Sequence, residues 1–121
     1  MRVLFDTNIL IDYIAGKSQA KKEIEQHPNS FISVISWIEV LVGAEDPGEE
    51  AALSEFLSRF RIQQLTQSVA ARAVEIRRER NIRLPDAIIW ASALDQECLL
   101  VTRNSKDFPS KDASIRIPYR L

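Results

Sequence analysis

The segment Val3-Leu4-Phe5-Asp6-Thr7-Asn8-Ile9-Leu10 decides the fold class. Its first three residues form a short apolar run, which is typical of a strand buried on both faces of a parallel sheet. From residue 8 to residue 15 the apolar side chains recur at helical spacing, since Ile9 and Tyr13 lie four positions apart. A strand followed at once by a helix is the repeating unit of an α/β domain, and Asp6 lies at this junction.

The rest of the chain continues this alternation. Further strands are predicted at residues 30–34, 62–65, 99–102 and 115–117. Further helices are predicted at residues 17–26, 37–42, 49–60, 69–80 and 85–96. A chain of 121 residues suffices for one compact domain but not for two. We therefore expect a single three-layer α/β/α domain over residues 1–121, with a mainly parallel sheet.

Composition narrows the class of protein. The sequence is 45% hydrophobic and 27% charged, as in a soluble globular protein. No apolar run approaches the roughly 18 residues of a membrane span, and no signal peptide is expected. Cys98 is the single cysteine, so it is expected to be a buried thiol rather than half of an intrachain disulfide. These features favour a cytoplasmic location.

The charges are unevenly distributed along the chain. The formal net charge is −1, which gives no global attraction to nucleic acid. Residues 39–55 contain six acidic side chains and no basic one, whereas residues 72–83 contain five arginines and two glutamates. The sequence therefore predicts a basic lip beside an acidic pocket.

Four acidic residues lie at strand ends or helix starts, and each has an ordinary structural explanation. Asp6 fits a helix N-cap, and Asp86, after Pro85, fits an ordinary first helical turn. Glu39 ends Ser36-Trp37-Ile38-Glu39, which fits a capping box whose glutamate reaches back to the cap residue. Asp107 fits a turn. Either explanation, structural or functional, remains open for each residue taken alone.

Taken together, the four acids predict a metal site. The carboxyl ends of parallel strands meet at one edge of the sheet, where ligands of such folds bind. Clustered carboxylates repel one another unless a cation neutralises them. An all-oxygen site selects a hard ion, Mg²⁺ or Mn²⁺, and zinc is disfavoured because His27 and Cys98 are isolated. The sequence offers no histidine relay and no glycine-rich phosphate loop.

Four blocks of the sequence resemble the PIN domain, and within it the VapC-type toxins of bacterial toxin–antitoxin pairs. The blocks are Asp6-Thr7-Asn8-Ile9-Leu10-Ile11-Asp12, Ser36-Trp37-Ile38-Glu39 with Gly43, Leu84-Pro85-Asp86-Ala87-Ile88-Ile89, and Val101-Thr102-Arg103-Asn104 with Asp107-Phe108. They occur in the family's order and spacing, and the similarity runs from residue 2 to nearly residue 121.

The resemblance implies a magnesium-dependent endoribonuclease, usually a homodimer, that acts on RNA and is inhibited by a cognate antitoxin protein. Matched position by position, Asp6, Glu39 and Asp86 are three catalytic and metal-binding acids. Relatives carry the fourth acid at either of two positions. Asn104 is an amide here, so Asp107 is assigned as the acid and Asn104 as a neutral helper. Thr7 and Thr102 match hydroxyl positions that orient the cluster.

The expected chemistry is hydrolysis of an RNA phosphodiester by water that a metal ion activates, with no protein nucleophile. Arg77 and Arg103 are candidate contacts for substrate phosphate, with solvated surface charge as the alternative explanation. Two other classes stay open. One is a catalytically weak PIN-fold module that acts with its partner on nucleic acid. The other is a phosphohydrolase that acts on small substrates.

The partners expected from the sequence depend on exposed apolar helical surface. The segments 49–60 and near Trp37 hold more apolar residues than one short sheet can bury, which favours a homodimer. The antitoxin is expected to lie along an apolar groove near Trp37 and Val40. It is also expected to direct a basic side chain towards the acids.

Overall fold

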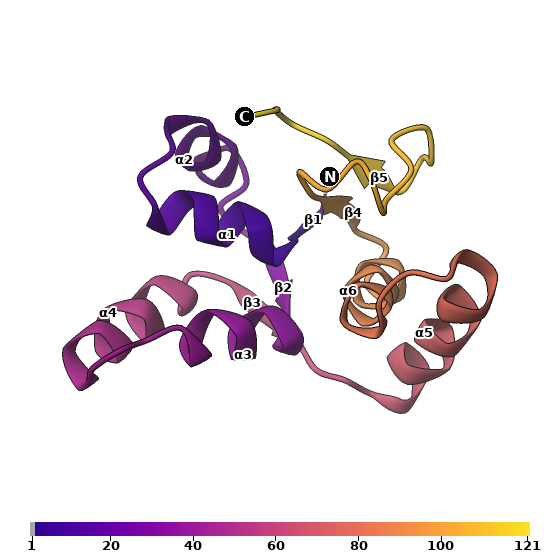
Figure 1. Ribbon diagram of the computed structural model, residues 1–121, viewed down its shortest axis with the longest axis horizontal. Helices are drawn as coiled ribbons and strands as arrows, with labels where there is room; N and C mark the ends of the chain where they lie inside the picture. Colours follow the sequence, from indigo (N-terminus) through magenta and orange to yellow (C-terminus); the bar gives the residue numbers. More distant parts are fainter. Residues whose placement is uncertain (1) are drawn as a thin grey trace.

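The computed structural model describes residues 2–121, which form five strands and six helices (Figure 1). The strands are β1 (Val3–Phe5), β2 (Phe31–Ser33), β3 (Arg61–Gln63), β4 (Leu99–Val101) and β5 (Ile115–Arg116). The helices are α1 (Thr7–Ile14), α2 (Ser18–Glu25), α3 (Val34–Val42), α4 (Pro47–Leu57), α5 (Gln67–Arg80) and α6 (Leu84–Asp95).

The strands form one sheet in the order β3-β2-β1-β4-β5, and every neighbouring pair is parallel. In the centre of the sheet, Val3 of β1 lies opposite Leu99 of β4, and Phe5 lies opposite Val101. The carboxyl ends of the strands therefore share one edge, and Asp6 follows β1 directly at that edge. The predicted parallel α/β sheet is confirmed.

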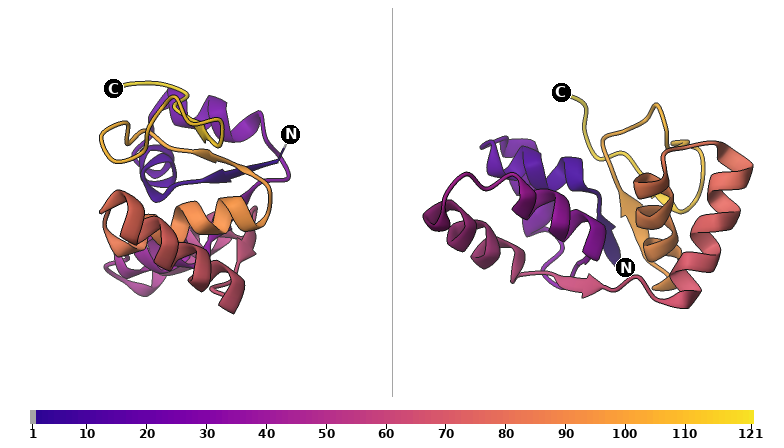
Figure 2. Two further views of the ribbon diagram at one scale, coloured as in Figure 1. Left: turned by 90° about the vertical axis from the view of Figure 1, so that its right-hand side faces the viewer. Right: turned by 60° about the horizontal axis from the view of Figure 1, so that its bottom comes forward.

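Helices cover both faces of the sheet. Val3 and Phe5 pack in the same core as α1, α2 and α4, whereas Leu4, which points to the opposite face, packs against α5 and α6. Figure 1 shows this division, with α1 to α4 on the left of the strands and α5 and α6 on the right. The right-hand view of Figure 2 shows the same two groups. The expected three-layer arrangement is confirmed.

Helix α3 begins earlier than the predicted start at residue 37. The side chain of Ser33 accepts a hydrogen bond from the Ile35 N–H at 3.1 Å and caps the helix, which starts at Val34. Strand β2 therefore passes directly into α3 with no connecting loop. Helix α4 also ends earlier than predicted, at Leu57, but Phe60 beyond it is still buried.

Helices α1 and α3 each leave several apolar residues exposed, whereas α4 leaves none of its large apolar residues exposed. The apolar residues predicted for the α4 segment are all buried within the chain, so the expectation of surplus apolar surface there is wrong: they are Leu53, Phe56, Leu57 and Phe60. The expectation for α3 is confirmed, because Trp37 and Ile38 are exposed and Val42 is 78% exposed. Ile11 and Ile14 of α1 are exposed as well.

One smaller expectation is also met. Cys98 is a buried free thiol, and burial raises its pKa. Among residues 2–121, no helix has both the length and the apolar character that crossing a membrane requires.

Candidate active site

Asp6 lies where β1 ends and α1 begins, and it is 4% exposed. One carboxylate oxygen, Oδ1, accepts from the Thr7 N–H at 2.7 Å, so the N-cap interpretation is correct. The other, Oδ2, accepts from the Thr102 hydroxyl at 2.7 Å and from the Asn8 amide at 3.3 Å. These bonds fix the carboxylate at the carboxyl edge of the sheet, between β1 and β4.

The surroundings of Asp6 penalise its negative charge. Burial raises the pKa of Asp6 to about 6, although the hydrogen bonds from Thr102 and Thr7 act in the opposite direction. The negative charges of Asp86 and Glu39 raise this pKa further. A cation placed among these three carboxylates reverses the effect of the two neighbouring charges, so the site favours a positively charged ligand.

Glu39 approaches Asp6 from the middle of α3. The Thr7 hydroxyl donates to Glu39 Oε1 at 2.7 Å and lies 2.8 Å from Ser36 Oγ. The capping-box explanation of Glu39 is wrong, because Ser33 caps α3 and Glu39 lies well inside the helix. Its carboxylate is instead held by Thr7, the residue that follows Asp6.

Asp86 lies in the first turn of α6, with Pro85 before it, and is 6% exposed. Arg83, at the N-cap position, places its Nε 3.2 Å from Asp86 Oδ2. The Arg83 side chain is 76% exposed. Asp86, and at longer range Asp107 and Glu39, raise the pKa of Arg83. An exposed cation therefore lies beside a buried carboxylate.

The loop after β4 carries the remaining predicted residues. The Asn104 N–H donates to Thr102 Oγ1 at 3.0 Å, which ties the loop to the hydroxyl that supports Asp6. The Asn104 amide donates to Asp107 Oδ2 at 2.9 Å, and the Asp107 N–H donates back to Asn104 Oδ1 at 3.2 Å. Of this pair, Asn104 lines the cleft and Asp107 is not among the lining residues.

One open cleft at the carboxyl edge of the sheet collects these groups. Its lining residues are Asp6, Thr7, Asn8, Ile11, Glu39, Arg83, Asp86, Arg103 and Asn104. The structure thus brings together three of the four predicted acids, from three separate elements. The fourth, Asp107, does not line the cleft but is hydrogen-bonded to Asn104, which does.

The donor set fits a hard divalent ion. Carboxylate and amide oxygens from β1, α3, α6 and the loop after β4 are ligands that Mg²⁺ and Mn²⁺ prefer. Within residues 2–121, no three histidine, cysteine, aspartate or glutamate side chains are already gathered tightly enough to enclose an ion unaided. Mg²⁺ is compatible with such an open arrangement, because it keeps several waters and commonly uses only one or two carboxylates.

The two arginines predicted to contact substrate lie in different surroundings. Arg77, on α5, donates to Asn81 Oδ1 and is not among the residues that line the cleft. Arg103 borders the cleft, but its guanidinium is paired with Asp12. The residue missed by sequence reasoning is Arg83. Its position immediately before Leu84-Pro85-Asp86 is the sequence feature that could have identified it. The residue that precedes a helix lies close to an acidic residue in the first turn of that helix.

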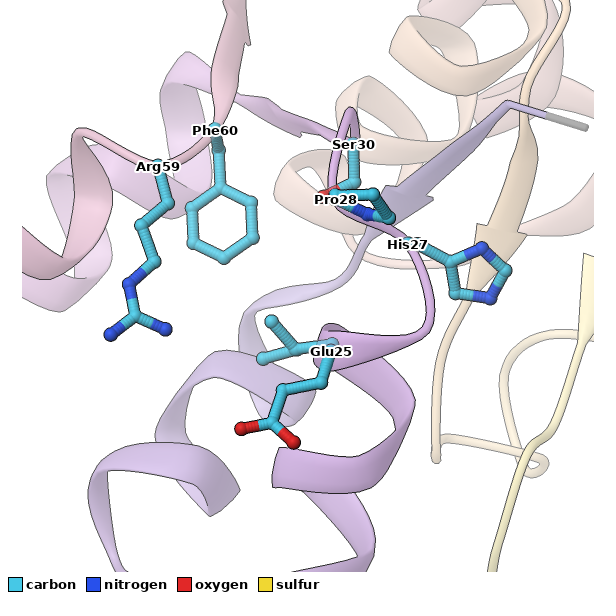
Figure 3. Close-up of a pocket in the computed structure, with 7 residues that line it drawn as sticks. Glu25, His27, Pro28, Ser30, Arg59 and Phe60 are labelled. Atoms are coloured by element: carbon cyan, nitrogen blue, oxygen red, sulfur yellow. The ribbon is translucent and has the colours of Figure 1, made fainter.

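A second pocket lies at the opposite edge of the sheet, near the starts of β2 and β3. It is lined by Ile24, Glu25, His27, Pro28, Ser30, Arg59 and Phe60. Figure 3 shows Arg59 and Phe60 together on one side and Pro28 and His27 on the other. His27 is partly buried and pairs with Glu23 at 3.5 Å, so it is not simply solvent-facing as its polar turn suggests. The carboxylates of Asp6, Glu39 and Asp86 lie at the carboxyl edge of the sheet and not in this pocket.

The fold and the cleft together define a parallel α/β domain with an acidic, cation-favouring cleft at the carboxyl edge of its sheet. The model of the PIN domain matches residues 3–113, which is most of the chain. The chain belongs to the PIN-domain family.

Known proteins similar to the chain include both sequences and solved structures. "Ribonuclease VapC1" of Methanocaldococcus jannaschii is 27% identical over 112 residues, which cover 88% of this chain and 79% of that protein. A "toxin-antitoxin complex from Klebsiella pneumoniae" contains a chain that is 42% identical, with a TM-score of 0.92. That match covers 98% of this chain and 99% of the other. A VapBC structure from Salmonella typhimurium, 24% identical, has a TM-score of 0.82 over 97% of this chain and 96% of that one, and supports the fold alone.

Proposed function

We propose that this chain is a metal-dependent endoribonuclease that acts as the toxin of a type II toxin–antitoxin pair. One observation carries the proposal: Asp6, Glu39 and Asp86 converge from three elements on one cleft of a PIN domain. The similar proteins support it, because one is named a ribonuclease and another comes from a toxin–antitoxin complex.

The proposed cofactor is Mg²⁺ or Mn²⁺. Asp6, Glu39 and Asp86 would hold it, and the fourth place falls to Asn104 or, through a shift of the loop, to Asp107. The ion supplies a Lewis acid that polarises the phosphodiester and lowers the pKa of the attacking water. The bond broken is a P–O bond of RNA, and the water oxygen takes its place on phosphorus.

The chain's own residues orient the groups around this reaction. Thr102 and Thr7 hold the carboxylates of Asp6 and Glu39, so the acids keep their positions when RNA enters. Arg83 is the cation best placed to contact a substrate phosphate, because its exposed side chain borders the cleft. A substrate phosphate would compete with the Asp86 carboxylate for the Arg83 guanidinium.

A catalytically weak binding module is the alternative function, and a small-molecule phosphohydrolase is a more distant one. Cleavage of RNA by the isolated chain separates an enzyme from a binding module. Comparison with a chromogenic phosphodiester separates RNA from small substrates.

The proposed partners are a cognate antitoxin and a second copy of the chain, in the cytoplasm. The exposed apolar residues of α1 and α3 are the surface proposed to bind them. Val40, which sequence reasoning placed in the antitoxin groove, is only 2% exposed and belongs to the core. Trp37 and Ile38 remain candidate contacts. Ile11 of α1 is also exposed and lines the acidic cleft.

Expression in bacterial cells tests the proposed role. We expect the wild-type chain to arrest growth and co-expression of the neighbouring open reading frame to relieve the arrest. Asp86→Asn should be harmless, whereas Glu50→Gln, a change of an exposed acid on α4, should arrest growth like the wild type. Equal toxicity of Asp86→Asn and the wild type would contradict a nuclease mechanism at this cleft.

A further inference from the structure

Asp12 is a buried carboxylate outside the cleft. It lies on α1, is 5% exposed and accepts three hydrogen bonds. Arg103 donates from Nε to Asp12 Oδ2 at 2.7 Å and from Nη2 to Oδ1 at 3.0 Å, which is a two-point guanidinium–carboxylate pair. Tyr119 donates its hydroxyl to Oδ2 at 2.8 Å. The C-terminal segment thereby contacts α1, and Figure 1 shows the chain ending near α2.

This network is joined to the cleft through Asn8, one helical turn before Asp12. The Arg103 N–H donates to Asn8 Oδ1 at 3.1 Å. The Asn8 amide in turn lies 3.3 Å from Asp6 Oδ2 and 3.2 Å from Thr102 Oγ1. The backbone of Arg103 is therefore part of the support of Asp6, while its side chain is directed to Asp12.

The charges of the cleft give this pairing a consequence. Arg103 borders a cleft that holds the carboxylates of Asp6, Glu39 and Asp86. A guanidinium without a partner of its own is attracted to such a cluster. In the cleft, such a guanidinium would repel a divalent cation and would occupy the carboxylate oxygens that the cation needs.

We propose that Asp12 is a positioning residue which, with Tyr119, holds the Arg103 guanidinium away from the acidic cleft and so keeps the cleft available to a metal ion. The proposal rests on the proposed function, since it assumes that the cleft binds a divalent ion.

A charge-removal series tests this role with Mn²⁺ binding, measured by calorimetry, as the readout. Asp12→Asn keeps the size of the side chain but leaves Arg103 without its anionic partner. We expect Asp12→Asn to weaken Mn²⁺ binding by about tenfold, the usual size of an effect transmitted through residues that support a metal site. The double variant Asp12→Asn/Arg103→Gln removes the freed charge as well and should recover most of the lost affinity.

This rescue separates positioning from simple structural damage. If Asp12 serves only the packing of α1 and the C-terminal segment, the second substitution adds damage, and the double variant binds Mn²⁺ no better than Asp12→Asn. Melting temperatures of all variants are measured alongside. Tyr119→Phe, which removes one hydroxyl, is the milder variant if Asp12→Asn does not fold, and it should weaken Mn²⁺ binding.

Tyr13→Phe is the matched control for Tyr119→Phe. Tyr13 also lies on α1, but its hydroxyl accepts from Arg59 and does not contact Asp12, so Mn²⁺ binding should be unchanged. RNA cleavage by the wild type is assayed with the same preparation. If the wild type binds Mn²⁺ and cleaves RNA, and Asp12→Asn binds Mn²⁺ as tightly as the wild type, the role inferred for Asp12 is wrong. The proposed function then still stands. A wild type that neither binds Mn²⁺ nor cleaves RNA overturns the proposed function and this inference together.

Discussion

Asp6 shows how one residue serves both the fold and the site. Its Oδ1 caps α1 through the Thr7 N–H, while its Oδ2 is fixed by Thr102 from the neighbouring strand end. Capping alone does not require a buried carboxylate, because Asn caps helices as well as Asp does. What Asn cannot supply is the negative charge, whose burial raises the pKa of Asp6 to about 6.

The raised pKa of Asp6 predicts a pH-dependent stability. The Asp6 carboxyl binds a proton more tightly in the folded chain than in the unfolded chain, where its pKa is near 3.8. The stability that this proton binding contributes is therefore fully present below pH 3.8. It is lost as the pH rises through about 6. Without metal, we expect Asp6→Asn to be more stable than the wild type at pH 8, by on the order of 3 kcal/mol.

The control for this prediction is the same pair of proteins at lower pH. Thermal or urea unfolding at pH 5 should give a smaller difference, because the wild-type carboxyl is then largely protonated. If the difference in stability between Asp6→Asn and the wild type is the same at pH 5 and pH 8, the buried charge of Asp6 does not destabilise the fold.

Glu39 gives a second prediction at the residue scale. Glu39→Gln keeps an oxygen that can accept from the Thr7 hydroxyl but removes the charge. We expect RNA cleavage to fall by about 100-fold or more, the scale of loss expected when a metal site is impaired. The melting temperature should hold or rise, because a repulsive charge is lost. Glu50→Gln, on the exposed surface of α4, is the control, and a fully active Glu39→Gln enzyme would remove Glu39 from the site.

The sequence predicted which acids meet but not how the neighbouring side chains are directed. Asp6, Glu39 and Asp86 follow from the edge that parallel strands share and from the family blocks. The relation of Asn104 to Asp107 depends on a loop closed by mutual hydrogen bonds, which no periodic pattern specifies. The partner of Arg103, residue 12 on another element, is likewise set by tertiary contacts.

At the scale of elements, the boundaries that sequence predicted well are those with a change of polarity or a proline. Helix α6 begins within one residue of the predicted start because Pro85 marks its first turn. The start of α3 was predicted three residues late because β2 and α3 form one continuous apolar stretch. Only the bond between the Ser33 hydroxyl and the Ile35 N–H reveals where the strand ends.

That cap predicts a stability effect confined to α3. Ser33→Ala removes the acceptor for the Ile35 N–H and should lower the free energy of unfolding by about 1 kcal/mol. Ser54→Ala, at an exposed interior position of α4, should leave stability unchanged or raise it slightly, because Ala is the better helix former. Urea unfolding of both variants provides the measurement. A Ser33→Ala protein as stable as the wild type would place the start of α3 elsewhere.

At the scale of the whole molecule, α3 connects two surfaces. One side of the helix carries Glu39 into the cleft, and the exposed apolar residues Trp37, Ile38 and Val42 lie on the same helix. We propose that these apolar residues form part of a partner interface. An occupant of this surface therefore lies next to the acids, which makes α3 the element through which partner binding and metal binding can influence each other.

The proposed homodimer is testable on this surface. We expect the mass of a dimer at micromolar concentration in light scattering, and the mass of a monomer for Val42→Asp, since Val42 is 78% exposed and its charge would be buried in an interface. The melting temperature of a Val42→Asp monomer reports whether the fold survives. A wild type that is monomeric at this concentration contradicts the dimer.

Cleavage of RNA by the purified chain is the measurement that tests the central claim most directly. The wild type, Asp6→Ala and Asp86→Ala are each incubated with total RNA and Mg²⁺, Mn²⁺ or a chelator, and the new ends are mapped. We expect the wild type to cut RNA at defined sites with either ion and not to cut it with the chelator. We expect neither variant to cut RNA, although both remain folded. Cleavage that persists in the chelator or in both variants would contradict the proposed function.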